Sequence, residues 1–172
     1  MTTLPGEELV QIVDQHNLPI GARPRRIMRQ QGLIHRASYI LVFNSRGELF
    51  VQKRTMAKDI YPGYWEIAAG GVTLAGESDD DSAHRELREE LGIAAVDLEF
   101  LFHHYHQSAD NRVWGAVYRC CHDGPFRLQP EEVEYGEFVP MLEVLRRMDQ
   151  VDFTPDSPEI LDTLIGSSRA VG

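Results

Sequence analysis

Apolar residues recur along the chain with two different spacings, and each spacing predicts a different kind of element. Alternation or short apolar runs typical of strands occur at 8–14, 37–43, 49–52, 65–69, 96–106, 113–121 and 138–139. Helical spacing occurs at 79–91, 140–148 and 158–165, and a short helix at 25–31 is indicated by Pro24 before it and Gly32 after it. Strands outnumber helices but helices lie between them, which predicts an α/β layered domain rather than an all-β barrel.

Turn residues between these segments predict two hairpins. Residues 16–21 follow the first apolar segment, so we expect residues 1–35 to form an N-terminal hairpin and the short helix. A glycine-containing turn at 44–48 predicts a second hairpin between the two apolar runs on either side of it. Residues 54–65 show no clear period and are interpreted as a loop, the kind of segment that often carries ligand contacts. We expect residues 1–172 to form a single domain.

Composition excludes several classes of protein. With 42% hydrophobic and 26% charged residues, the chain is typical of a soluble domain, and its apolar runs are shorter than the roughly 20 residues of a membrane span. The first residues have neither the basic start nor the apolar stretch of a secretory signal, so we expect a cytoplasmic protein. Cys120 and Cys121 are neighbours, which fits neither a disulfide framework nor a CxxC site, and we interpret them as core residues of a strand.

The charge balance narrows the choice of partner. A net charge of −10 repels the phosphate backbone of a nucleic acid, so polymeric DNA or RNA is not expected as a partner. The same surface would suit a small phosphate-bearing substrate only if divalent cations stood between carboxylates and phosphates. Whether the chain acts alone or as a homodimer stays open.

The helix predicted at 79–91 gathers acidic side chains on one face. Ser78 and Asp81 form a capping box at its start, and Gly92 suits the left-handed position that ends it. At about 100° per residue, Glu86 and Glu90 lie one turn apart on the same face.

Glu89 lies on the flank of that face, and the adjoining apolar stripe consists of Ala83, Leu87 and Leu91. Like charges at this spacing repel one another, and a dication with oxygen ligands would offset the repulsion. The alternative is a solvated acidic face, which is what most charge runs on helices are.

The spacing of the fixed residues favours the metal site. Residues 71–93 match the pattern Gly-x5-Glu-x7-Arg-Glu-aliphatic-x-Glu-Glu-x-Gly-aliphatic at every fixed position, and this segment resembles the Nudix box. The resemblance implies an α/β/α sandwich with a mixed sheet. It also implies metal-dependent hydrolysis of a diphosphate linkage, typically in a nucleoside diphosphate linked to another moiety.

The resemblance also implies roles for residues by their position in the box. Glu86 and Glu90 match the main ligands of Mg²⁺ or Mn²⁺, Glu89 matches a further ligand or base, and Gly71 offers its carbonyl oxygen in many members. Arg85 matches an arginine that orients a glutamate, and Glu77 matches the supporting glutamate at the helix start. Such an ion neutralises diphosphate oxygens and activates an attacking water.

Candidate residues outside the box are less sharply defined. The general base is either Glu89 or an acid of the 131–134 cluster, where Glu132 ranks first because it precedes an expected strand. The alternative interpretation is that residues 131–134 form only a charged loop with no catalytic role. Arg54 and Lys58 would suit the diphosphate of the substrate, and the alternative is that both are exposed loop cations.

Residues outside the box resemble the branch of the family that includes isopentenyl-diphosphate isomerase, and within it the YfcD-type hydrolases. The rival function is therefore that isomerase, which uses a cysteine, a glutamate and a histidine-rich metal site. The isomerase cysteine falls at Gly70, and two of its metal-binding histidines fall at Val72 and Met28, which leaves only His35 in register. The residues therefore argue against isomerisation.

Two further alternatives complete the sequence interpretation. His103, His104 and His106 alternate along an expected strand, but two of the three share a face and no carboxylate lies nearby in sequence, so we favour ordinary strand histidines over a metal site. A module that senses a nucleotide derivative without turnover is the third functional hypothesis. The complete set of glutamates favours catalysis over such a module.

Overall fold

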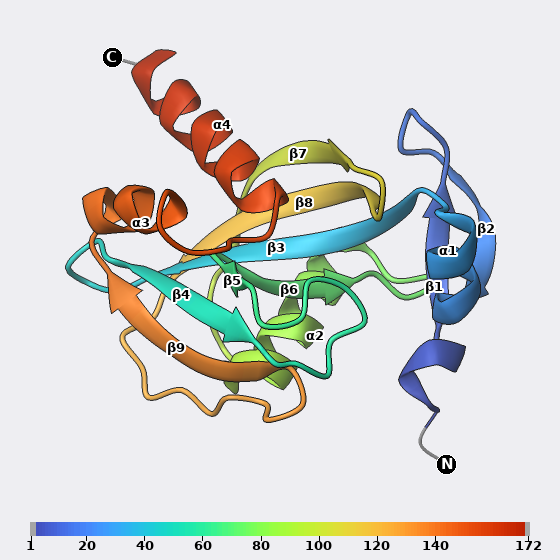
Figure 1. The fold of residues 1–172 in the computed structure, drawn as a ribbon, viewed down its shortest axis with the longest axis horizontal. Coiled ribbons are helices and arrows are strands. Elements are labelled where there is room, and N and C mark those ends of the chain that lie inside the picture. The colour runs from blue at the N-terminus through green and yellow to red at the C-terminus, as the bar shows by residue number, and fades with distance from the viewer. Residues whose placement is uncertain (1–2, 171–172) are drawn as a thin grey trace.

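The computed structural model describes residues 3–170, which form a nine-stranded sheet with helices packed against it (Figure 1). The elements in chain order are η1 (Pro5–Glu7), β1 (Leu9–Val13), β2 (Pro19–Pro24), α1 (Arg25–Gln31), β3 (His35–Phe43), β4 (Leu49–Arg54), β5 (Trp65–Glu66), β6 (Ala69–Val72), α2 (Asp79–Leu91), β7 (Glu99–Gln107), β8 (Arg112–Cys121), β9 (Val133–Val139), α3 (Met141–Met148) and α4 (Asp156–Ala170). Within residues 3–170, no helix is long and apolar enough to cross a membrane.

Strand β3 is the centre of the sheet. It pairs along its whole length with β8 in parallel, while β1, β6 and β4 share its other side in antiparallel pairings. The remaining strand pairs are antiparallel, so the sheet is mixed and the predicted α/β class is confirmed.

The predicted hairpin between β3 and β4 holds only at its turn. The two strands pair at Phe43 and Leu49, and beyond that point β6 occupies the side of β3 where a hairpin partner would lie. Gly70 explains how β6 comes so close, because a Cβ atom there would lie 1.9 Å from the carbonyl oxygen of Ser38. The two strands therefore separate, and β4 turns to pair with β5 and β9.

The two faces of the sheet bury different helices. Side chains alternate along β3, so Ile40 and Val42 pack with the apolar stripe of α2 on one face. Leu41 lies on the other face, in a core that includes Val144 of α3 and Ile160 of α4. Figure 1 shows α3 and α4 together on the opposite side of the sheet from α2. This arrangement gives the layers α2, sheet, and α3 with α4.

The N-terminal segment closes one end of the sheet. β1 and β2 pair in antiparallel fashion, and the buried side chain of Met28 on α1 packs against Val10 and Ile12 of β1. Figure 1 shows β1, β2 and α1 together at this end. Arg25 and Arg29 of α1 consequently lie near the loop that follows β4, since both contact Asp59.

Several boundaries differ from the sequence prediction. The single strand expected at 65–69 is two strands, β5 and β6, separated by the buried residues Ile67 and Ala68. β9 starts five residues earlier than expected, because exposed polar residues such as Glu134 alternate with its apolar ones. Cys120 is buried but Cys121 is exposed, so the expectation that both pack in the core is wrong for Cys121, which the period of a strand turns outward.

We expect Leu87→Ala to lower the free energy of unfolding by about 2–5 kcal/mol, because Leu87 is fully buried between α2 and the sheet. Leu142→Ala is the matched control, since that leucine is 75% exposed on α3 and its loss should cost less than about 0.5 kcal/mol. Urea unfolding followed by circular dichroism measures both values. Equal, small losses would contradict the packing of α2 described above.

Candidate active site

The ends of α2 are set by local capping. The Ser78 hydroxyl accepts a hydrogen bond from the backbone N–H of Asp81 at 3.1 Å, and Gly92 ends the helix in the left-handed conformation. The buried apolar stripe fixes the rotation of the helix about its axis. Glu86 and Glu90 are thereby turned toward β6 and are only 9% and 3% exposed.

Glu90 lies deepest, at the junction of α2, β4 and β6. Its carboxylate accepts hydrogen bonds from the side-chain amide of Gln52 at 3.0 Å and from the backbone N–H of Gly70 at 3.3 Å. Burial raises the pKa of Glu90 well above its usual value, and the negative charges of Glu66 and Glu86 act in the same direction. The hydrogen bonds from Gln52 and Gly70 therefore do not offset the free-energy cost of burying the ionised form of Glu90.

Glu86 lies directly against Gly71. A Cβ atom at position 71 would lie 2.7–2.9 Å from the three carboxylate atoms of Glu86, so any side chain there would displace the carboxylate. Burial raises the pKa of Glu86 to about 7, although the positive charge of Arg85 opposes the shift. The absence of a side chain at 71 thus leaves room for the Glu86 carboxylate beside the backbone of β6.

Arg85 holds three glutamates in place. Its guanidinium donates to both carboxylate oxygens of Glu77 at 2.6 and 3.0 Å, a bidentate pair that ties the loop before α2 to the helix. It also donates to Glu86 at 2.7 Å and to Glu89 at 3.2 Å. Glu89 keeps half its side chain exposed, so it can reach solvent or a ligand beside the buried pair.

These residues fit a hard divalent cation. The carboxylates of Glu86, Glu89 and Glu90 and the backbone of Gly71 offer only oxygen ligands, which Mg²⁺ and Mn²⁺ prefer. Water stabilises the charged form of a buried carboxylate only weakly, so a bound cation stabilises it more than it would an exposed one. The predicted ligands lie on α2 and the adjoining strand, with Glu86 against Gly71, Glu90 bonded to the N–H of Gly70 and Glu89 bonded to Arg85.

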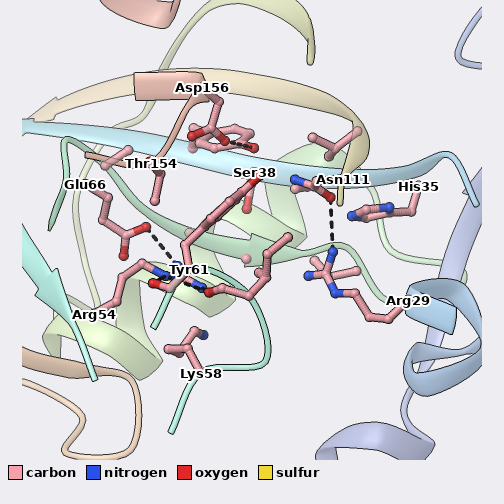
Figure 2. Close-up of a pocket in the computed structure, with 18 of the residues that line it drawn as sticks. Arg29, His35, Ser38, Arg54, Lys58, Tyr61, Glu66, Asn111, Thr154 and Asp156 are labelled. Carbon is pink, nitrogen blue, oxygen red and sulfur yellow. Dashed lines mark hydrogen bonds and ion pairs between the residues drawn. The ribbon is translucent and has the colours of Figure 1, made fainter. Parts of the chain in front are cut away.

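A pocket opens beside these glutamates, and Gly70 and Gly71 line it. Figure 2 shows other lining residues of this pocket, with Arg54 and Lys58 on one side and Asp156 on another. The end of β4 contributes Arg54 and the loop after it contributes Lys58, while α1 contributes Arg25 and Arg29. The wall opposite the loop comes from β3 and from the segment before α4. In that wall the Tyr39 hydroxyl donates to Asp156 at 2.6 Å.

Arg54 holds the loop as well as lining the pocket. Its guanidinium donates to the carbonyl oxygens of Ile60 and Tyr61 and forms an ion pair with Glu66 at 3.0 Å (Figure 2). The alternative interpretation as an exposed loop cation is therefore wrong for Arg54, whose side chain is 11% exposed.

Lys58 is equally buried and forms an ion pair with Glu132. Glu132 precedes β9, and its negative charge is close enough to raise the pKa of Glu86. The 131–134 cluster is thus more than a charged loop, because one of its acids lies beside the pocket.

Sequence inspection missed several pocket residues. Arg25 and Arg29 stand four residues apart on α1, which puts both on one helix face, but a basic helix face is usually solvated and gives no sign of a pocket. Both pair with Asp59 and, although burial opposes the shift, hold the pKa of that carboxyl below its usual value. Gln52 and Glu66 carried no sequence signal, because their link to Glu90 depends on β4 leaving β3.

The histidines of β7 also differ from expectation. His104 and His106 both contact one carboxylate oxygen of Glu159, which lies on α4 more than fifty residues later. No carboxylate lies near these histidines in sequence, but the fold brings a distant one to them, so the interpretation as ordinary strand histidines loses that support.

Comparison with known proteins shows which family this chain belongs to. A family model described as NUDIX domain matches residues 33–162. An uncharacterized Nudix hydrolase of Pseudomonas aeruginosa is 44% identical over 90% of this chain and 91% of its own length. The uncharacterized Nudix hydrolase YfcD of Escherichia coli strain K12 is 42% identical over 92% of this chain and 87% of its own.

Two solved structures show the same fold at lower identity. A crystal structure of a Deinococcus radiodurans protein has a TM-score of 0.79 at 22% identity, and covers 91% of this chain and 98% of its own. The NUDIX domain of Shewanella oneidensis NrtR, complexed with ADP ribose, has a TM-score of 0.60 at 16% identity, and covers 77% and 86%.

The pocket residue His35 should make stability depend on pH. Burial lowers its pKa to about 3, and the charge of Arg29 acts in the same direction. Between about pH 6 and 4 the unfolded chain binds a proton at this histidine and the folded chain does not, so the free energy of unfolding falls as pH falls. The contribution is about 1.4 kcal/mol per pH unit.

We therefore expect His35→Gln to flatten the pH dependence by about that slope, measured by urea unfolding at several pH values. His16→Gln, at an exposed turn residue, is the matched control and should keep the wild-type slope. Parallel curves for His35→Gln and the wild type would contradict the neutral state of His35.

Proposed function

Because the chain belongs to the Nudix family of hydrolases, which act on diphosphate bonds, we propose that it hydrolyses a small molecule in which a nucleoside diphosphate is linked to another moiety. Mg²⁺ or Mn²⁺ is the proposed cofactor. The main support is the buried pair Glu86 and Glu90, two like-charged carboxylates whose burial raises both of their pKa values. Burying such a pair is costly unless a cation joins it.

The ligands proposed for the cation are Glu86, Glu90, Glu89 and the carbonyl oxygen of Gly71. When bound, the ion neutralises the diphosphate oxygens of the substrate and acidifies a water that attacks phosphorus. Arg85 is a positioning residue, since it holds Glu86 and Glu89 at fixed distances from one another. Glu77 supports Arg85 through the bidentate pair.

The candidates to accept the proton of the attacking water are Glu89 and Glu132. Glu89 is half exposed next to the buried pair, and Glu132 forms an ion pair with Lys58, which lines the pocket. Both carboxylates are paired with a cation, Glu89 with Arg85 and Glu132 with Lys58, and Glu89 is favoured because it adjoins the buried pair and is the more exposed of the two. If the substrate diphosphate binds Lys58, that binding would release Glu132 in the same step.

The pocket favours an anionic substrate despite the acidic surface of the protein. Arg25 and Arg29 share a single acidic partner, Asp59, so this group keeps a net positive charge. Lys58 and the remaining N–H groups of Arg54 add donors nearby. A diphosphate would therefore bind between the cations on one side and the glutamate-bound ion on the other.

A substrate panel tests this function. We expect purified protein with Mg²⁺ to hydrolyse at least one nucleoside diphosphate derivative, with ADP ribose included because a Nudix domain of the same fold has been solved with it. Excess chelator should abolish hydrolysis, and Mg²⁺ or Mn²⁺ should restore it. Since a bound dication supplies several kcal/mol of transition-state stabilisation, Glu86→Gln and Glu90→Gln should each lower kcat by about 100-fold or more.

Glu99→Gln is the matched control for these variants, because Glu99 is exposed on β7, away from the pocket, and its ion pair is with Arg119. It should keep wild-type turnover. Full hydrolysis in excess chelator, or wild-type rates in both glutamate variants, would refute the proposed site. Tight binding of a nucleotide derivative without turnover would instead favour the sensing module.

The isomerase rival has its own test. The positions that match its cysteine and one histidine are Gly70 and Val72 of β6, and the position of another histidine is the buried core residue Met28. With isopentenyl diphosphate and Mg²⁺, we therefore expect no dimethylallyl diphosphate. Chromatography would detect the product. Its formation at an enzyme-like rate would overturn the conclusion that this protein is not an isomerase.

A further inference from the structure

Two histidines and a glutamate converge on the side of the sheet that carries α4. The Nε2 atom of His104 and the Nδ1 atom of His106 each lie 2.8 Å from the same carboxylate oxygen of Glu159. His104 and His106 are two residues apart on β7, so the pleat of the strand points both rings toward α4. His103 points to the other face, where it contacts Asp79 of α2.

We propose that His104, His106 and Glu159 form a second metal site, which binds a divalent metal ion of intermediate Lewis-acid hardness such as Zn²⁺. One ligand atom from each residue lies within 4.8 Å of the other two. In a tetrahedral zinc site with bonds of about 2.0–2.1 Å, ligand atoms lie about 3.3 Å apart. The glutamate oxygen is already 2.8 Å from both nitrogens, so a small outward movement of its side chain would admit the ion.

The ligand chemistry separates this site from the glutamates of α2. Imidazole nitrogen suits Zn²⁺, Ni²⁺ and Cu²⁺, whereas Mg²⁺ prefers oxygen ligands only. His106 is 3% exposed, and its other ring nitrogen, Nε2, is buried without a hydrogen-bond partner among residues 3–170. The Nδ1 atom is therefore the nitrogen through which this ring interacts. Glu159 is 44% exposed, which leaves a side for water to complete the coordination.

The ion would link two elements that shape the pocket. Glu159 lies in the first turn of α4, three residues after Asp156, whose side chain lines the pocket and accepts from Tyr39. An ion held between β7 and α4 would therefore fix the start of α4 against the sheet. This inference does not depend on the proposed hydrolysis, because Zn²⁺ binding and thermal stability can be measured without substrate.

The test is calorimetric titration of the full-length protein with Zn²⁺ in the presence of excess Mg²⁺, which occupies the oxygen site. We expect one equivalent of Zn²⁺ to bind and to raise the melting temperature. His104→Gln and Glu159→Gln should each weaken this binding by at least about tenfold and remove most of the thermal shift. Both side chains lie at the surface of the cluster, so neither change opens a core cavity.

His103→Gln is the matched control, since it removes an imidazole from the same strand but from the opposite face. It should keep the wild-type Zn²⁺ affinity and thermal shift. The proposal is overturned if the wild type binds no Zn²⁺ under these conditions. It is equally overturned if all four proteins bind Zn²⁺ alike, or if Glu90→Gln rather than Glu159→Gln abolishes binding.

Discussion

The placement of two like-charged carboxylates at the junction of α2 with the sheet is the constraint on which the rest of the site depends. Glu86 fits only because Gly71 has no side chain, and Glu90 receives donors from both β4 and β6 because β4 separates from β3 and β6 pairs with β3 instead. Arg85 pairs with Glu86, whereas no cation among residues 3–170 forms an ion pair with Glu90. The fold fixes the positions of the two carboxylates but does not fully compensate their negative charge, which a bound cation would do.

Features set by short-range interactions could be predicted from the sequence. The helix 79–91 is observed at the predicted boundaries, because its cap, its apolar stripe and its terminal glycine all act within a few residues. The β3–β4 hairpin was predicted from a local turn, and it is wrong beyond the turn because β6 competes for the same edge of β3. Long-range strand pairing of this kind leaves no trace in the period of either strand.

The candidate site likewise contains residues that local sequence predicts and residues that only tertiary contacts bring together. Residues of the box could be placed on one face of a helix from their spacing alone, whereas the pairing of Arg25 and Arg29 with Asp59 joins segments thirty residues apart. Glu66 and Asp156 also come to the pocket through tertiary contacts with Arg54 and Tyr39. The proposed metal ligands are therefore close in sequence, while the pocket proposed to bind the substrate is assembled from distant parts of the chain.

This division explains how one fold supports different substrates. Changes in α1, in the loop after β4 or in the segment before α4 would alter the pocket without moving the carboxylates, since α2 is held by its own stripe and by Arg85. The first turn of α4 is held at two points, because Asp156 bonds to Tyr39 and Glu159 bonds to the histidines of β7. A change at the β7 cluster would therefore reach the pocket wall through one turn of helix, while the glutamates on the opposite face of the sheet would keep their geometry.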